Sequence, residues 1–191
     1  MDRCKVGVIG CGDISRVYLH SLTQVFRNTQ VVAVSSRGGE SARRRAAEFD
    51  IPYAVSTEEL LAMEFDIVVI LTDPVSHFRL AEQALLAGKH TYVEKPLAAT
   101  TAEAAHLLTL AREKNLMLTC APDTLLGGGI QTCRKLIDNG LIGTPVASVG
   151  QTFNGGPESW HPNPFFLYQK GAGPLYDVGP YYIGGILYLL G

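Results

Sequence analysis

The sequence predicts a doubly wound α/β domain with a parallel sheet over residues 1–120, followed by an incomplete α+β second domain over residues 121–191. Three observations lead to this fold class. Short apolar runs alternate with longer segments of helical period, several runs are nearly continuous Val and Ile, and this rhythm stops near residue 121. Because strand–helix–strand alternation requires right-handed crossovers, we expect the strands of the first domain to be parallel.

The elements of the first domain follow one another in regular order. Apolar runs predict strands over residues 4–9, 31–34, 53–54, 67–71, 90–93 and 117–121. Helical periodicity predicts helices over residues 14–26, 41–49, 75–87 and 101–114, the third of them ending at Gly88.

The remaining residues are less regular. They predict a helix over 130–139, a half-buried antiparallel strand over 145–153 and an apolar helix over 175–190. The Gly-, Pro- and Asn-rich stretch 154–173 has no periodicity, and a loop of that length is usually functional or disordered. Its Trp160-His161 pair is a candidate for substrate contact, although ordinary loop chemistry explains it nearly as well.

Composition excludes several classes of protein. The 16 Lys and Arg against 18 Asp and Glu leave a net charge of -2 without a basic cluster, which argues against a nucleic-acid partner. The most apolar stretch, 181–190, has half the length of a membrane span. The 4 Cys lie far apart, so we expect no metal site, no disulfides and a cytoplasmic location.

A glycine-rich turn joins the first expected strand to the first expected helix. The residues that would surround a pyrophosphate there are Gly10, Gly12, Asp13, Ile14 and Ser15. Gly10 permits a tight turn, and Gly12 lets a dinucleotide approach the backbone at a helix N-terminus. Ser15 replaces the usual third glycine and offers a hydroxyl to a phosphate. The position between strand and helix favours a dinucleotide site over an ordinary turn.

The end of the second expected strand selects the nucleotide. NAD-binding domains carry Asp or Glu there for the ribose 2′-hydroxyl, whereas this chain has Ser36 followed by Arg37. Serine tolerates a 2′-phosphate, and arginine pairs with it or stacks on the adenine. We therefore expect NADP in preference to NAD, unless Arg37 is only a solvated residue in a surface turn.

Two later strands also end in polar residues, where ligands bind in open α/β sheets. Thr72-Asp73 and His77 follow one strand, and Glu94-Lys95-Pro96 follows the next. The Glu-Lys-Pro sequence resembles the Gfo/Idh/MocA family, named for glucose–fructose oxidoreductase and inositol dehydrogenase. The segment 171–181, Gly-Ala-Gly-Pro-Leu-Tyr-Asp-Val-Gly-Pro-Tyr, is similar to a second signature of that family.

The resemblance implies a role for each of these residues. Glu94 would hold the cofactor ribose, and the loop with Thr72, Asp73 and His77 would line the nicotinamide. Lys95 would bond the reacting oxygen of the substrate, and Asp177 would orient the substrate. Tyr181 stands where many members have the acid/base histidine.

A phenol of pKa about 10 is a poor base at neutral pH unless a cation stabilises its phenolate, and Lys95 is the obvious cation. Plainer interpretations stay open for the catalytic residues. Lys95 could be a surface lysine, Asp177 a helix cap, and Tyr181 a packing residue beside other tyrosines of the last helix. His77 could be an ordinary residue of a helix N-terminus.

The resemblance implies an NAD(P)-dependent oxidoreductase that acts on a sugar, a polyol or a related alcohol. Two alternatives remain: NAD-dependent glycoside hydrolysis through transient oxidation, and a non-catalytic dinucleotide-binding fragment. Family members run well past 300 residues, so the 191 residues suggest a chain truncated in its C-terminal domain. The full-length form is expected to be a homo-oligomer.

Overall fold

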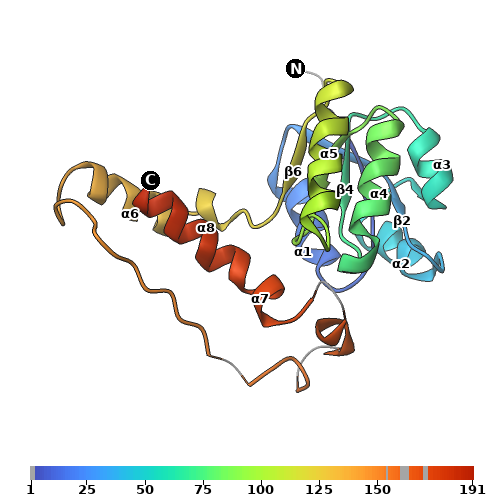
Figure 1. Cartoon of the computed structure of the whole chain (residues 1–191). Coiled ribbons are helices and arrows are strands. Elements are labelled where there is room, and N and C mark those ends of the chain that lie inside the picture. The colour runs from blue at the N-terminus through green and yellow to red at the C-terminus, as the bar shows by residue number, and fades with distance from the viewer. Residues whose placement is uncertain (1–2, 154, 160–163, 170–171) are drawn as a thin grey trace. The chain divides into compact units, whose positions relative to one another are not determined.

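The computed structural model describes residues 3–153, 155–159, 164–169 and 172–191. The chain forms two compact units, Met1–Cys120 and Ala121–Gly191. Figure 1 shows strands and flanking helices in the first unit and helices joined by long connections in the second. Each unit is described separately below.

The first unit is built on a parallel sheet. Its strands are β1 (Cys4–Ile9), β2 (Thr29–Ser35), β3 (Tyr53–Val55), β4 (Ile67–Ile70), β5 (His90–Val93) and β6 (Leu118–Cys120). They lie in the order β3-β2-β1-β4-β5-β6, and every pair is parallel. The strand order reverses between β1 and β4, which is the switch point where open α/β sheets bind ligands. The predicted doubly wound α/β fold is confirmed.

Helices flank the sheet (Figure 1). They are α1 (Ser15–His20), which continues as a π-helical segment (Ser21–Val25), α2 (Glu40–Phe49), α3 (Thr57–Ala62), α4 (Pro74–Leu86) and α5 (Thr101–Glu113). Sequence periodicity did not predict α3, because its six residues are too few to show a period. A local signal exists, since Ser56 and Glu59 form a reciprocal capping box at its N-terminus.

The strand side chains divide into two core clusters because successive side chains of a strand point to opposite faces. One cluster joins Ile9, Val68 and Ile70 to α3, α4 and α5. The other joins Val8, Val34 and Val69 to α1 and α2 and their flanking segments. This two-sided burial explains the continuous Val and Ile runs.

Close packing, and not a turn, explains the glycine at position 7 in β1. A Cβ built at Gly7 would lie 2.9 Å from the Phe65 ring and 3.0 Å from Leu60. Both neighbours are buried and belong to the first core cluster. The helix–sheet contact at this point therefore depends on the missing side chain.

The regular elements of the second unit, over the residues that the structure describes, are all helices. It contains a 3-10 turn (Thr124–Leu126), α6 (Gly128–Asp138), a 3-10 segment (Pro164–Tyr168), α7 (Pro174–Asp177) and α8 (Gly179–Leu190). Helices α6 and α8 are joined by Arg134, whose Nη1 donates to the carbonyl oxygens of Tyr188 and Leu189 at 3.2 and 3.1 Å. None of the described helices is long and apolar enough to cross a membrane.

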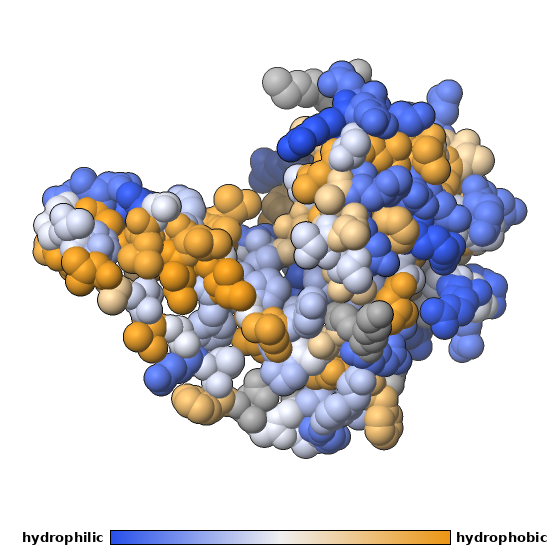
Figure 2. Space-filling view, viewed as in Figure 1, coloured by the Kyte–Doolittle hydropathy of each residue, from blue (hydrophilic) through white to orange (hydrophobic). Residues whose placement is uncertain are grey.

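Two predictions for the second unit are corrected. Residues 145–153 do not form a strand; Val146 and Phe153 are 94% and 90% exposed, and the described part of this unit offers no strand to pair with. The expected helix over 175–190 is divided at Val178 into α7 and α8. Figure 2 shows apolar side chains at the surface of this unit. The exposed apolar residues of the unit include Leu126, Leu175 and Leu187.

Candidate functional site

The predicted cofactor residues of the first unit lie at one edge of the sheet. In the parallel register Ile9 is level with Ser35 and with Ile70, and Ile70 is level with Val93. Residues that directly follow these four positions therefore meet at the carboxyl edge. Gly10, Ser36, the Leu71-Thr72 pair and Glu94 begin the four connections there.

Gly10 and Gly12 shape the turn after β1 in different ways. Gly10 has a φ of +102°, and a Cβ there would lie 2.6 Å from the carbonyl carbon and oxygen of Leu71. Gly12 is exposed, and a Cβ there would meet nothing within 4 Å. The backbone of Gly12 thus faces open space that a side chain would fill, beside the exposed residues Asp13 and Ile14. This cradle fits the pyrophosphate of a dinucleotide.

Ser15 is buried beneath this turn rather than exposed. Its hydroxyl donates to the carbonyl oxygen of Gly12 at 2.6 Å, so its hydrogen is directed into the turn and not toward a phosphate. Arg45 of α2 reaches the same place: Nε donates to Ser15 Oγ at 3.0 Å and Nη2 to Gly12 O at 3.2 Å. Sequence reasoning missed Arg45, because nothing distinguishes it from the neighbouring arginines 43 and 44.

The turn after β2 holds the expected 2′-phosphate residues. Ser36 accepts a hydrogen bond at Oγ from the Ala42 N–H at 3.1 Å, which ties it to the start of α2. Arg37 is exposed. A second cation, Arg43, lies beside Gly39, because its Nη1 would be 3.0 Å from a Cβ built there. The turn therefore combines a small hydroxyl side chain with two arginines and has no carboxylate at position 36.

His77 is fully buried and does not line an open surface. Its Nε2 lies 2.8 Å from the carbonyl oxygen of Thr72, and its Nδ1 lies 2.7 Å from the carbonyl oxygen of Pro96. The ring therefore joins the loop after β4 to the loop after β5. Thr72 also accepts a hydrogen bond from the Ser76 hydroxyl at 2.8 Å, and Asp73 is exposed at the N-cap of α4.

Glu94 is held by two donors from different elements. The Tyr18 hydroxyl of α1 donates to Oε1 at 2.6 Å, and the Lys95 backbone N–H donates to Oε2 at 2.9 Å. The Tyr92 hydroxyl oxygen lies 3.3 Å from that of Tyr18. Burial, together with the bond to Glu94, raises the pKa of Tyr18, so its hydroxyl keeps its hydrogen. Sequence reasoning missed Tyr18.

The other two predicted catalytic residues belong to the second unit. Asp177 ends α7, and Tyr181 lies in the first turn of α8 and is 36% exposed. The N-cap of α8 is Val178, without a side-chain cap, so Asp177 is not the N-cap of that helix. Tyr182 lies against Gly150, and the Tyr188 hydroxyl accepts a hydrogen bond from Gln131 at 2.9 Å. Trp160 and His161 lie outside the described residues.

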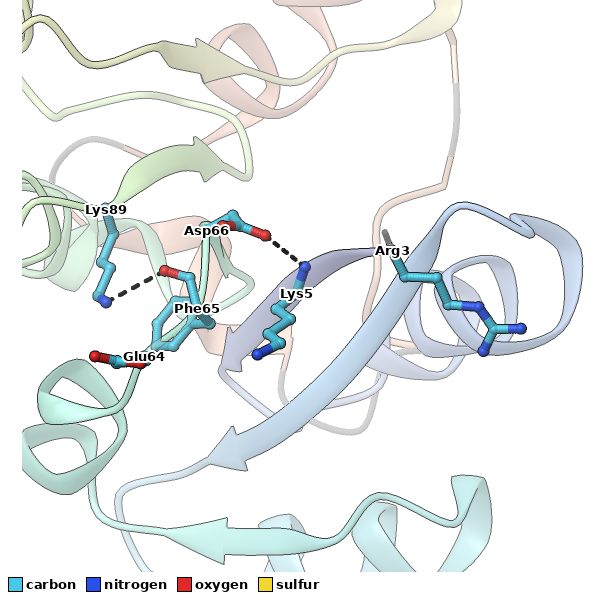
Figure 3. A pocket seen from close by; sticks show the side chains of 6 residues that line it. All are labelled: Arg3, Lys5, Glu64, Phe65, Asp66 and Lys89. Carbon is cyan, nitrogen blue, oxygen red and sulfur yellow. Dashed lines mark hydrogen bonds between the residues drawn. The ribbon is translucent and has the colours of Figure 1, made fainter. Parts of the chain in front are cut away.

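A pocket lies at the opposite edge of the sheet, where β1, β4 and β5 begin (Figure 3). It is lined by Arg3, Lys5, Glu64, Phe65, Asp66 and Lys89. The Lys89 ammonium donates to the carbonyl oxygens of Met63 and Phe65 at 2.7 and 3.2 Å and stands 4.5 Å from the Phe65 ring centre. These contacts hold the segment between α3 and β4 in place.

A six-stranded parallel sheet with a glycine turn at its switch point defines a Rossmann domain, the class of fold that binds nicotinamide dinucleotides. The family model described as "Oxidoreductase family, NAD-binding Rossmann fold" matches residues 4–121. The model described as "GFO/IDH/MocA C-terminal domain" matches residues 130–191. The chain belongs to the Gfo/Idh/MocA oxidoreductase family, as the resemblance implied.

Individual relatives agree with this membership. The dTDP-3,4-didehydro-2,6-dideoxy-alpha-D-glucose 3-reductase of Streptomyces violaceoruber is 34% identical over 178 residues, which are 93% of this chain and 52% of the relative. The 3-ketoreductase KijD10 of Actinomadura kijaniata, solved with NADP, is 33% identical with a TM-score of 0.69 over 74% of this chain and 46% of that one.

The likeness to a further solved structure supports only the fold. GenD2 of gentamicin A biosynthesis, solved with NAD, is 23% identical, with a TM-score of 0.85 over 100% of this chain and 54% of that one. The chain spans about half the length of the relatives it matches.

Proposed function

We propose that this chain carries the cofactor-binding and catalytic residues of an NAD(P)-dependent oxidoreductase that transfers hydride between a nicotinamide cofactor and a sugar, a polyol or a related alcohol or carbonyl compound. The observation that carries the proposal is the Glu94-Lys95 pair at the end of β5. Two hydrogen bonds fix Glu94 at the edge that also holds the open Gly12 turn. In this division the first unit, residues 1–120, binds the cofactor, and the second, residues 121–191, begins the substrate domain.

NADP is the preferred cofactor in this proposal, with NAD as the second choice. Ser36 leaves room for a 2′-phosphate, and the exposed Arg37 supplies a cation. KijD10, which is 33% identical to this chain, was solved with NADP. Gly10, Gly12, Asp13, Ile14 and Ser15 would form the turn around the pyrophosphate.

The substrate class rests on the relatives. The Streptomyces relative is named as a reductase at carbon 3 of a dTDP-linked deoxysugar, and KijD10 is named as a 3-ketoreductase. A carbonyl or hydroxyl group of a sugar ring is therefore the reacting group that we propose for this chain.

The proposed mechanism assigns one task to each residue. A bound nicotinamide would supply or accept the hydride. Lys95 donates a hydrogen bond to the reacting oxygen, and Glu94 accepts from the cofactor ribose with the lone pairs that Tyr18 and the Lys95 N–H leave unused. Tyr181 moves the hydroxyl proton, and Asp177 orients the substrate. Thr72, Asp73 and His77 form or support the wall beside the nicotinamide.

The test begins with calorimetric titration of NADP and NAD into the chain. Arg37→Ala should weaken NADP selectively, whereas an equal loss for both cofactors contradicts the proposed 2′-phosphate site. A panel of sugars and polyols follows. Lys95→Ala and Tyr181→Phe should each lower turnover by roughly 100-fold or more, as expected for loss of a positioned acid or base, with cofactor affinity nearly intact.

Lys114→Ala is the matched control for Lys95→Ala. Lys114 is an exposed lysine at the C-terminal end of α5 and lies outside the proposed site. Unchanged turnover in both catalytic variants refutes the assignment. Formation of NADPH in step with product separates dehydrogenation from glycoside hydrolysis through transient oxidation.

Location and assembly are part of the same proposal. We expect a cytoplasmic protein, which the reduced thiols of Cys4, Cys11 and Cys133 support. For a full-length form we expect a homo-oligomer, which light scattering would test.

A further inference from the structure

Arg45 is a charged residue in an unusual place. It lies on α2, yet its side chain is only 7% exposed, and its guanidinium reaches the turn after β1. Burying a guanidinium costs free energy unless its donors are used. Here Nε, Nη1 and Nη2 each donate, to Ser15, Glu48 and Gly12 respectively.

The contacts of Arg45 converge on one peptide group. The carbonyl oxygen of Gly12 accepts from Arg45 Nη2 at 3.2 Å and from the Ser15 hydroxyl at 2.6 Å. Arg45 Nε in turn donates to Ser15 Oγ at 3.0 Å, so the two side chains also orient each other. Ser15 is completely buried, which excludes water as a competing partner for this arrangement.

A fixed Gly12 carbonyl also fixes the amide that follows it. In a trans peptide the C=O and the next N–H point in opposite directions. Two donors that hold the Gly12 oxygen toward the interior therefore direct the Asp13 N–H away from it, on the side of the turn where Gly12 and Asp13 are exposed. An N–H held in this direction is a ready donor to an anion.

The surrounding charges favour an anion as well. Glu48 is shared between Arg45 and Arg16, with shortest distances of 2.6 and 2.8 Å, so the three side chains together carry one net positive charge. The hydrogen bond from Arg45 holds the pKa of Glu48 below its usual value, which keeps this carboxyl ionised and Arg45 in place.

We propose that Arg45 is a positioning residue for dinucleotide binding: together with Ser15 it holds the Gly12–Asp13 peptide in the orientation that presents its N–H to the cofactor pyrophosphate. This inference rests on the proposed function, because it concerns the same turn. It adds a residue from outside the glycine motif and assigns Ser15 a role in supporting the turn in place of direct phosphate contact.

The test compares dissociation constants of NADP and NAD, measured by calorimetry, for the parent chain, Arg45→Met, Ser15→Ala and the double variant. Arg45→Met should weaken both dinucleotides by about tenfold, the loss of one hydrogen bond to a charged group. Ser15→Ala should weaken both by roughly fivefold, since its hydroxyl is neutral. The double variant should be no more than about twofold weaker than Arg45→Met, because both residues act on one peptide.

Arg44→Met is the matched control, because Arg44 is the exposed neighbour on the same helix; it should bind within about twofold of the parent chain. Far-UV circular dichroism establishes that each variant is folded. If Arg45→Met does not fold, Ser15→Ala decides, and unchanged affinity in that variant overturns the inference.

Three other outcomes also decide. A folded Arg45→Met with a lowered unfolding midpoint but unchanged affinity overturns the inference, since that is the result of a purely structural role. A loss confined to NADP overturns it too, because it would place Arg45 at the 2′-phosphate. Failure of the parent chain to bind either dinucleotide refutes the proposed function itself.

Discussion

Replacement of His77 by alanine tests whether the imidazole holds the two loops at the carboxyl edge together. The ring is fully buried between the carbonyl oxygens of Thr72 and Pro96, at 2.8 and 2.7 Å. A buried acceptor that loses its donor costs about 1–3 kcal/mol, and the space left by the ring adds to this. We expect His77→Ala to lower the free energy of unfolding by about 3 kcal/mol.

The assay is urea unfolding followed by far-UV circular dichroism, with the transition of the sheet unit analysed separately because two units need not unfold together. His77→Gln, whose amide can still donate to one carbonyl, should recover part of the loss. The control is His106→Ala: this side chain is 52% exposed and bonds Glu82 at 2.8 Å at the surface, so the change should cost less than about 1 kcal/mol.

A loss of less than about 1 kcal/mol for His77→Ala would refute the reasoning, because a buried carbonyl group that loses its donor, together with the space left by the ring, costs more than that. Equal losses for His77→Ala and His106→Ala would refute it as well, since they would show that burial and the pair of contacts do not matter.

Three further predictions concern the same edge. Gly10→Ala should destabilise the chain by about 3 kcal/mol in urea unfolding, because the new Cβ lies 2.6 Å from backbone atoms and φ is +102°; a neutral effect would contradict this geometry. Tyr18→Phe should cost about 2 kcal/mol in the same assay, since Glu94 loses a charge-assisted bond, and an unchanged midpoint would count against that bond. Burial raises the pKa of the Cys11 thiol from 9.0 to about 11, so its stabilising contribution is complete below pH 9.0 and declines as pH rises through about 11. At pH 8 a thiol reagent should label the exposed Cys133 and spare Cys11 until the chain unfolds; rapid labelling of both would contradict the burial.

The sequence predicted the central strands well because most residues of β1, β2 and β4 are buried, on both faces of the sheet, and these strands contain nearly continuous apolar runs. Helix α3 escaped prediction because six residues hold less than two turns, and only its capping box marks it. The strand expected over 145–153 was wrong, because alternating apolar residues stabilise a strand only beside a partner, and the described part of the second unit supplies none.

Sequence patterns can indicate those parts of the candidate site that the backbone forms. Gly10 and Gly12 lie between a strand and a helix, and a local sequence motif is enough to recognise this arrangement. Tyr18 and Arg45 act through side chains that reach other elements, 76 and 30 to 33 residues away along the chain, and no local pattern encodes such contacts. The sequence does not reveal that His77 is buried between the carbonyl oxygens of Thr72 and Pro96.

The three glycines of the first strand and turn have a practical consequence for experiments. A side chain at Gly7 would collide with buried side chains, and one at Gly10 with backbone, so neither change can report on ligand binding without also changing the fold. Gly12 is different, since a Cβ there enters open space at a φ that needs no glycine. Gly12→Ala therefore offers a way to separate folding from ligand affinity. The variant should keep the stability of the parent chain, so any loss of ligand affinity measures how closely the ligand approaches this backbone.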